Sequence, residues 1–454
     1  MPGTDVPEVF AAQLIFWILL PFVLFSPPRW AVLAWLVMGN LDATGPAQSA
    51  SGAIGWINAA KGVLLPLYLW WRVRQAPGEV AGTSPARLWL MLTGYAAVAS
   101  LWSPFPLPAV KLVGNMVGLL LAIIVLEKAA RKGLFRRDTL TILVVSSLCL
   151  GVIQTYYFAG TSYGFDGTDE PLRFSSFVAA QQYGAFLVAF LALVLWHDSL
   201  GTKLKCTLTV LLCTALALNG SRTWFVGAAI VSCIYLWLSS RRSAWIFAFA
   251  LSTVTLAVLL IVNLSTFDVD ILTDTSSRIV ATLSAIFAGK DTAHNAGLRN
   301  LSFRFLLYQG ALSEIRSSTT SEILLGHGTS SGGNIPLHVF PTHYSVDKLD
   351  ANRAIHNEWL RAYYEWGVLG LSLWIGVFGS LFAGLIVQYR KTAWKTRASA
   401  VLSFLPAFLA ALATENVIAG AGNAVTLSFA MMIGLLWDPT ISKLRAAGGP
   451  IVRA

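Results

Sequence analysis

Charged residues are scarce in this sequence, and their scarcity excludes an ordinary water-soluble protein. Only 12% of the 454 residues are charged, whereas 56% are hydrophobic, and soluble domains carry about 25% charged residues. The apolar residues form runs of about 18 to 22, the length at which a helix crosses a hydrocarbon core of about 30 Å. A soluble core would interrupt such runs with polar positions every turn or two. The sequence therefore predicts an all-α integral membrane protein.

Two further absences narrow the chemistry. No CxxC pair occurs, and each cysteine lies inside an apolar run, so we expect small packing residues instead of disulfides or metal ligands; the four are Cys149, Cys206, Cys213 and Cys233. The first ten residues contain no Lys or Arg. The apolar stretch at 11–25 is therefore expected to be a first membrane segment and not a cleaved signal peptide.

Apolar runs alternating with turn residues predict 12 or 13 transmembrane helices. We expect them near residues 11–25, 29–42, 53–71, 86–102, 108–127, 138–158, 176–197, 204–218, 222–239, 243–263, 362–388, 398–413 and 420–437. This divides the chain into N-terminal transmembrane helices (1–263), one large extracytoplasmic loop (264–357), and C-terminal transmembrane helices with a cytoplasmic tail (358–454).

The basic residues predict the orientation of these helices. Most of the 32 Lys and Arg residues fall on every second loop, and by the positive-inside rule those loops are cytoplasmic. The net charge of +10 is thus a topology signal, and a nucleic-acid partner is not expected.

The long loop is too large to be a mere connector. It contains amphipathic segments at 278–287 and 301–315, a glycine-rich turn at 326–333, and, up to residue 355, four of the six histidines. We expect the functional site here, on the extracytoplasmic side.

Several basic residues break the topology pattern and map to the extracytoplasmic ends of spans. They are Lys61, Lys111, Arg173, Arg222 and Arg361. Cations near membrane depth are costly and commonly functional, and together these would form a pocket for a phosphate or pyrophosphate. Arg222 sits in a tight turn opening a helix, where backbone N–H groups could grip the same anion. For Lys61 and Lys111, snorkelling to the lipid headgroups is an equal alternative.

The sharpest local pattern is the segment 356–370, His-Asn-Glu-Trp-Leu-Arg-Ala-Tyr-Tyr-Glu-Trp-Gly-Val-Leu-Gly. As one continuous helix, it would align His356, Leu360, Tyr363, Gly367 and Gly370 along one face. The glycines would admit a close neighbour. A neutral His356 at the water boundary could accept a proton from an attacking hydroxyl.

His-Asn, nine residues, Gly, two residues and Gly resembles the signature of the O-antigen ligase/polymerase (Wzy-C) superfamily. Arg173-Phe174-Ser175, Ser221-Arg222-Thr223, a loop helix from Arg304 to Ile315 and Gly326-His327-Gly328 follow the same order as the motifs of that family. The resemblance covers roughly residues 150–440.

The resemblance implies a GT-C-like, inverting glycosyltransferase of the bacterial inner membrane. Its donor would be an undecaprenyl-diphosphate-linked glycan, and its acceptor lipid A–core, another glycan or, in some members, a protein, on the periplasmic face. No cofactor, metal or nucleotide sugar is implied. Arg173 and Arg222 would hold the diphosphate, together with Arg304 and Lys111. His356 would act as base or orient the acceptor, with Arg361, His327 and Glu365 as secondary candidates.

Two alternatives stay open. A polymerase of the same superfamily would use the same donor and roles, and only the size of the outer loop favours a ligase. From a different class, a transporter of lipid-linked glycans would also place arginines at an outer cavity. The histidine-rich loop, and the lack of a convincing repeat between the two halves of the sequence, favour the enzyme.

Overall fold

The computed structural model describes residues 7–41, 60–73, 83–132, 134–157, 174–178, 180–239, 296–341, 355–390, 395–414 and 424–436. Helix is the only regular structure in these ranges, apart from an isolated bridge between Leu41 and Phe177. The expected all-α class is confirmed. The expected span at 243–263 and the amphipathic segment at 278–287 lie outside the described residues.

The described helices follow the expected spans closely. In the first half they are α1 (Pro7–Phe25), α2 (Pro28–Met38), the π-helical turn η2 (Ala60–Leu64), α4 (Leu65–Val73), α5 (Ser84–Ala99) with the 3-10 turn η4 (Ser100–Trp102), α6 (Pro106–Arg131) and α7 (Arg137–Tyr157). Then come α8 (Ala180–Trp196), α9 (Thr202–Asn219) and α10 (Arg222–Leu238). The described part of the long loop contains α13 (Ala296–Ser317), α14 (Thr320–Leu325), η5 (Ser331–Gly333) and α15 (Asn334–Val339). The chain continues with α16 (Glu358–Tyr389), α17 (Lys395–Leu412) and α18 (Ala424–Leu435).

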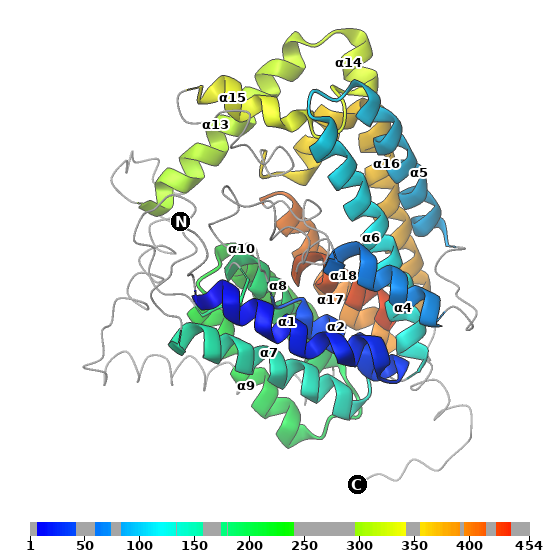
Figure 1. The fold of residues 1–454 in the computed structure, drawn as a ribbon, viewed down its shortest axis with the longest axis vertical. Helices are drawn as coiled ribbons and strands as arrows, with labels where there is room; N and C mark the ends of the chain where they lie inside the picture. The colour runs from blue at the N-terminus through cyan, green and yellow to red at the C-terminus, as the bar shows by residue number, and fades with distance from the viewer. Residues whose placement is uncertain are drawn as a thin grey trace.

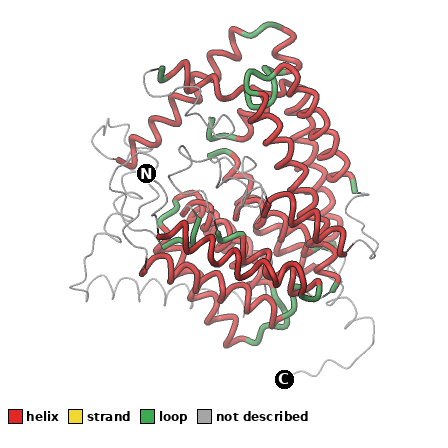
Figure 2. The backbone as a smooth tube through the Cα atoms, in the orientation of Figure 1, coloured by secondary structure: helices red, strands yellow, loops and turns green. Residues whose placement is uncertain are grey.

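Four of the described helices are long and apolar enough to cross a bilayer by themselves, namely α6, α7, α16 and α17. Shorter apolar helices, such as α8 and α18, pack between them and are almost completely buried. Figure 2 shows how completely helices fill the described chain. The structure is therefore that of a membrane protein.

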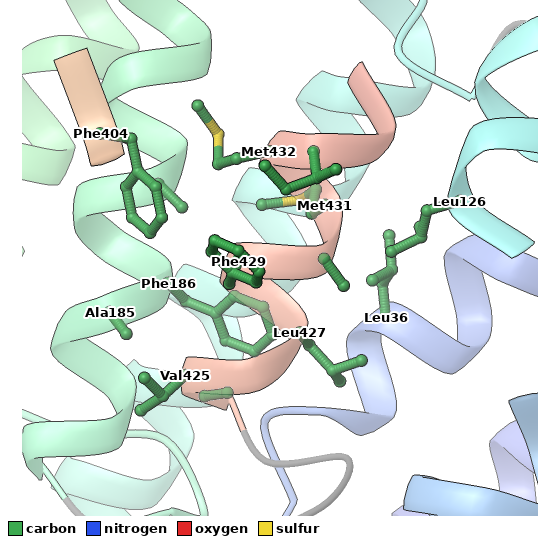
Figure 3. Close-up of a cluster of buried hydrophobic side chains, with 14 of the residues drawn as sticks. Leu36, Leu126, Ala185, Phe186, Phe404, Val425, Leu427, Phe429, Met431 and Met432 are labelled. Atoms are coloured by element: carbon green, nitrogen blue, oxygen red, sulfur yellow. The ribbon is translucent and has the colours of Figure 1, made fainter. Parts of the chain in front are cut away.

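Aromatic and aliphatic side chains fill the centre of the bundle. Phe186 of α8, Phe404 of α17 and Phe429 of α18 lie together there (Figure 3), and Leu36 and Leu126 bring α2 and α6 to the opposite side of α18. This core fixes the helix ends on which the candidate site is built.

The bundle has two chemically different ends. Arg29 forms an ion pair with Asp138 (3.3 Å), and the Nε2 atom of His197 lies 2.6 Å from the carbonyl oxygen of Phe135. These contacts join the turn between α1 and α2, the turn between α6 and α7, and the turn between α8 and α9. The positive-inside rule assigns all three turns to the cytoplasmic side, and we call this end of the bundle the basic end. The opposite end, called the site end, carries α13, α14 and α15; α14 lies beside the upper ends of α5 and α16 in Figure 1, and α13 and α15 extend from there towards the left.

The helix α16 is broken near the site end. Gly367 has φ 62° and ψ −164°, so residues 358–366 and 368–389 form separate helical pieces. The longer piece extends about 33 Å at 1.5 Å per residue, enough to cross the hydrocarbon core without the first piece. The break thus separates a spanning helix from a short helix that faces α13, α14 and α15, which together we call the loop layer.

Candidate active site

The turn before Arg222 is built by a glycine in the left-handed conformation. Gly220 (φ 65°) ends α9, and α10 begins two residues later at Arg222. Ser221, in the N-cap position between them, is buried and extended. The first N–H groups of α10, which have no partner within the helix, therefore face the site end. The side chain of Arg222 lies outside the described part, but its backbone position at the start of α10 agrees with the prediction.

The segment that follows Arg173 is hydrogen-bonded to this turn. The Phe174 N–H donates to the Leu218 carbonyl (3.1 Å), and the Asn219 amide nitrogen donates to the Phe174 carbonyl (2.8 Å). Arg173 itself is outside the described residues. The backbone next to it is nevertheless attached to the end of α9, one turn from Arg222.

The end of α17 connects α13 with the arginine turn. The Arg304 guanidinium donates to the carbonyl oxygen of Thr414. The hydroxyl of Thr414 lies 3.4 Å from that of Thr223, the residue after Arg222. Arg304 and the start of α10 therefore lie on opposite sides of one residue, which brings two of the predicted diphosphate-binding positions together.

One helical turn further along α13, Tyr308 reaches His356. Its phenol oxygen lies 2.9 Å from the His356 carbonyl and 3.4 Å from that of Ala413. Arg304 and Tyr308 are related by four residues on one helix, so they lie on the same face. This face of α13 therefore carries Arg304, a predicted phosphate ligand, and contacts the backbone of His356, the predicted base.

The expectation that His356 lies on the helix that follows it is wrong. His356 has φ 53°, a left-handed conformation uncommon for a residue with a side chain. The helix begins only at Glu358, because Asn357 adopts an extended backbone and its side-chain oxygen accepts the Leu360 N–H (3.0 Å). The His-Asn pair is thus a strained residue followed by a helix cap, and no continuous helical seam places the imidazole.

The glycines of the motif do admit close neighbours, as expected. A Cβ on Gly367 would lie 2.5 Å from the Leu324 backbone, and one on Gly370 would meet Tyr95 of α5 at 3.4 Å. Gly367 has a second role that the continuous-helix interpretation missed, because its positive φ creates the break in α16.

The Gly-His-Gly turn fills that break. The N–H groups of His327 and Gly328 donate to the carbonyls of Tyr364 and Glu365, each at 3.0 Å. An uninterrupted helix would have used these carbonyls internally. A Cβ on Gly326 (φ 79°) would lie 2.3 Å from the Glu365 carbonyl oxygen. The turn and the broken helix therefore satisfy each other's backbone groups, and the approach requires glycine.

Thr329 fastens the same turn to α5. Its N–H donates to the Ala99 carbonyl (3.3 Å), its hydroxyl to the Ala96 carbonyl (2.5 Å), and its hydroxyl oxygen accepts the indole N–H of Trp366 (3.1 Å). Thr329 is completely buried. Thr329 thus attaches the turn both to the end of α5 and to the short piece of α16.

Arg361 and Glu365 are buried in the short piece of α16. Arg361 is 1% exposed and pairs with Glu358 at 2.5 Å. Glu365 is fully buried, and one carboxylate oxygen accepts the Gly332 N–H at 3.4 Å. Both secondary candidates are thus engaged inside the protein, and Arg361 has an internal carboxylate partner.

Lys111 is not brought to this cluster. Its side chain is exposed on the first turns of α6, and within the described ranges no hydrogen bond or ion pair joins it to His356 or Arg304. The motifs in the sequence did not identify Tyr308 and Thr414, which connect the site residues. The one signal for Tyr308 in the sequence is its position four residues after Arg304, which places the two on the same face of a helix.

The fold and this cluster define a polytopic α-helical membrane protein with a histidine and arginines at one end of the bundle. Residues 207–375 match the Wzy_C family, described as O-Antigen ligase. The match runs from α9 into α16 and includes Arg222, Arg304, the Gly-His-Gly turn and His356. The resemblance derived from the motifs is therefore confirmed over this segment. No curated protein matches the chain.

Proposed function

We propose that this protein is an inner-membrane glycosyltransferase that transfers a glycan from undecaprenyl diphosphate to an acceptor on the periplasmic face, in the manner of an O-antigen ligase. The family match supports a membrane glycosyltransferase of the ligase/polymerase type. The observation that carries the proposal is the face of α13, on which Arg304 and Tyr308 connect the arginine turn with His356.

In the proposed reaction an acceptor hydroxyl oxygen attacks the anomeric carbon of the donor sugar. The bond between that carbon and the diphosphate oxygen breaks, and both bonding electrons leave with the diphosphate. The hydroxyl proton passes to the neutral imidazole of His356, which then releases it to solvent. Attack opposite the leaving group inverts the anomeric centre.

Stabilising the departing diphosphate is the main electrostatic task. The start of α10 offers backbone N–H groups and Arg222, and Arg304 lies across Thr414 from it. Fixed cations and dipoles aimed at developing charge typically contribute a factor of about 10² to 10³ in rate per group. Such a site supplies the required positive charge from side chains and backbone, so we propose transfer independent of metal, which chelation with EDTA would leave unchanged.

A ligase and a polymerase of this kind differ in the acceptor and not in the site. We propose lipid A–core as acceptor, because one large outer loop dominates the chain. The alternative is another lipid-linked glycan. Product length distinguishes them, since a ligase adds one preformed glycan per acceptor and a polymerase produces a ladder.

The test is glycan transfer in membranes from an undecaprenyl-diphosphate-linked donor, with each acceptor class offered separately. Arg304→Ala is compared with Arg316→Ala, a matched control at the exposed far end of the same helix. We expect loss of about 10²-fold in rate for the first and wild-type rate for the second. Equal rates in both variants, or no transfer by wild type with any acceptor, would reject the proposal and favour a transporter.

A further inference from the structure

The imidazole of His327 contacts three groups at once. Its Nδ1 atom lies 3.0 Å from the carbonyl oxygen of Tyr364, and its Nε2 atom lies 3.0 Å from the hydroxyl oxygen of Ser318. The ring stacks on the Tyr364 ring, with centroids 4.3 Å apart and planes 9° apart. His327 therefore joins the Gly-His-Gly turn to α16 and to the C-terminal end of α13.

Counting protons identifies the charge state in which all of these contacts are hydrogen bonds. The Tyr364 carbonyl only accepts, so Nδ1 must carry a proton. Ser318 has a single hydroxyl proton, and its oxygen lies 2.8 Å from the Glu314 carbonyl, which also only accepts. If Ser318 donates there, Nε2 must donate to Ser318. All three bonds therefore coexist only when both ring nitrogens carry protons, which is the imidazolium form.

The surroundings suit a positive ring. The Tyr364 face lies against it, and its phenol donates to a Glu314 carboxylate oxygen. The pKa of Glu322 is lowered by hydrogen bonds from the Thr319 backbone and hydroxyl, and to a smaller degree by attraction to His327. Ionisable groups on the elements around the ring include Glu314 and Arg316 (α13), Glu322 (α14), His338 (α15), Glu358, Arg361, Tyr364 and Glu365 (α16) and Tyr95 (α5). Four of these are carboxylates, while Arg361 is paired with Glu358 and Arg316 is exposed to solvent.

The same helix carries the site residues. Ser318 and Glu314 lie at the C-terminal end of α13, whereas Tyr308 and Arg304 contact the site about 15 Å away along a rigid rod. A change in how the C-terminal end is held therefore tilts or shifts the other end.

We propose that His327 is a positioning residue whose doubly protonated ring joins α13 and the Gly-His-Gly turn to α16, and so holds Tyr308 and Arg304 in place. The effect of His327 on catalysis rests on the proposed function, but its contacts with Ser318 and Tyr364, which we call the pin, do not. When the ring loses its second proton, Nε2 no longer donates to Ser318, so the full set of contacts exists only in the doubly protonated ring. Imidazoles ordinarily change charge between about pH 5 and pH 8.

Hydrogen exchange on the full-length protein in lipid nanodiscs tests the pin without any substrate. The probes are the amides of His327 and Gly328, which donate to α16, at about pH 5.5 and about pH 8.0, corrected for intrinsic exchange. We expect protection to fall about fivefold at the higher pH, the effect of one hydrogen bond of ordinary net strength. In His327→Gln the difference between the two pH values should vanish.

Two variants serve as controls. His197→Gln removes an imidazole at the basic end and should leave the pH difference unchanged. His338→Gln removes a second imidazole from the described part of the loop, which contacts Glu314 at 2.5 Å, and should leave the His327 effect in place. Protection independent of pH in the wild type, or a pH difference that survives in His327→Gln, would overturn the proposal.

The transfer assay adds a second readout. Activity that needs His356 neutral and His327 protonated has a bell-shaped pH profile, and His327→Gln should lose the alkaline limb while keeping the acidic one. An unchanged alkaline limb would contradict the positioning role. If transfer is absent in every variant but the exchange result holds, the proposed function fails and the pin stands.

Discussion

The phenol of Tyr308 donates a hydrogen bond to the backbone carbonyl of His356 across 2.9 Å. His356 has a positive φ, and such conformations persist only where surrounding contacts over-determine them. Tyr308 supplies one such contact from α13, and Asn357 supplies another by capping α16 on the other side. The backbone of His356 is thus held between two elements, α13 and α16.

Removing the Tyr308 hydroxyl should impair catalysis more than substrate binding. We expect Tyr308→Phe to lower kcat about tenfold with little change in KM, because the His356 backbone loses a donor while the donor-binding residues remain. Tyr389→Phe, at the opposite end of α16, is the control and should match wild type. Steady-state transfer kinetics measure both. A Tyr308→Phe enzyme with wild-type kcat would show that the bond does not position the base.

The break in α16 makes a prediction about stability. Gly367→Ala should destabilise the protein by more than about 1–2 kcal/mol, because it combines a positive φ with a Cβ 2.5 Å from the Leu324 backbone. Gly379→Ala lies on the same helix, where no atom stands within 4 Å of the new Cβ, and should be neutral or slightly stabilising. Thermal unfolding in detergent measures the difference. Equal melting temperatures would mean that the break is absent in solution.

The helix cap explains the second residue of the His-Asn motif. Asn357→Ala should cost about 1 kcal/mol, because the Leu360 N–H loses its acceptor. Asn357→Asp keeps an acceptor at the N-terminus and should restore stability. The thermal midpoints of the three proteins decide the matter, and an Asp variant as unstable as the Ala variant would exclude capping as the role of this residue.

The length of the apolar runs and the composition of the sequence predicted the fold, but they did not predict the local geometry of the site. Apolar run length placed α16 and α17 because membrane spans demand long uniform segments. A periodicity of 100° per residue predicts one continuous helix around His356, because nothing in that periodicity signals a positive φ at a histidine. Gly367 carried a visible hint, since a helix-breaking conformation is open to glycine.

The order of motifs predicted which residues belong to the site, but not how they meet. Arg304 and His356 are separated by much of a long loop, so their connection through Tyr308 depends on how α13 lies across the bundle. The resemblance makes His327, which is flanked by two glycines, a secondary candidate for the site. Gly326 admits the backbone of α16 and Gly328 admits that of Ser103, after η4, and the ring contacts Ser318 and Tyr364 within the protein.

The start of α10 gives a prediction about recognition of the donor. Arg222→Lys keeps the charge but loses the planar guanidinium that matches phosphate oxygens, so we expect KM for the lipid-linked donor to rise about tenfold. Arg390→Lys, after the end of α16 at the basic end, should have no effect. Titration of donor at saturating acceptor measures this. An unchanged KM for Arg222→Lys would place the diphosphate elsewhere.

The central claim is that His356 takes the proton of the acceptor hydroxyl, and one comparison tests it most directly. Glycan transfer is measured in membranes containing equal amounts of wild type, His356→Ala and His197→Ala, the last being a histidine at the basic end. The account predicts that His356→Ala lowers the rate by about 10² to 10⁴, while His197→Ala transfers at the wild-type rate. Wild-type transfer by His356→Ala would contradict it and remove this histidine from the mechanism.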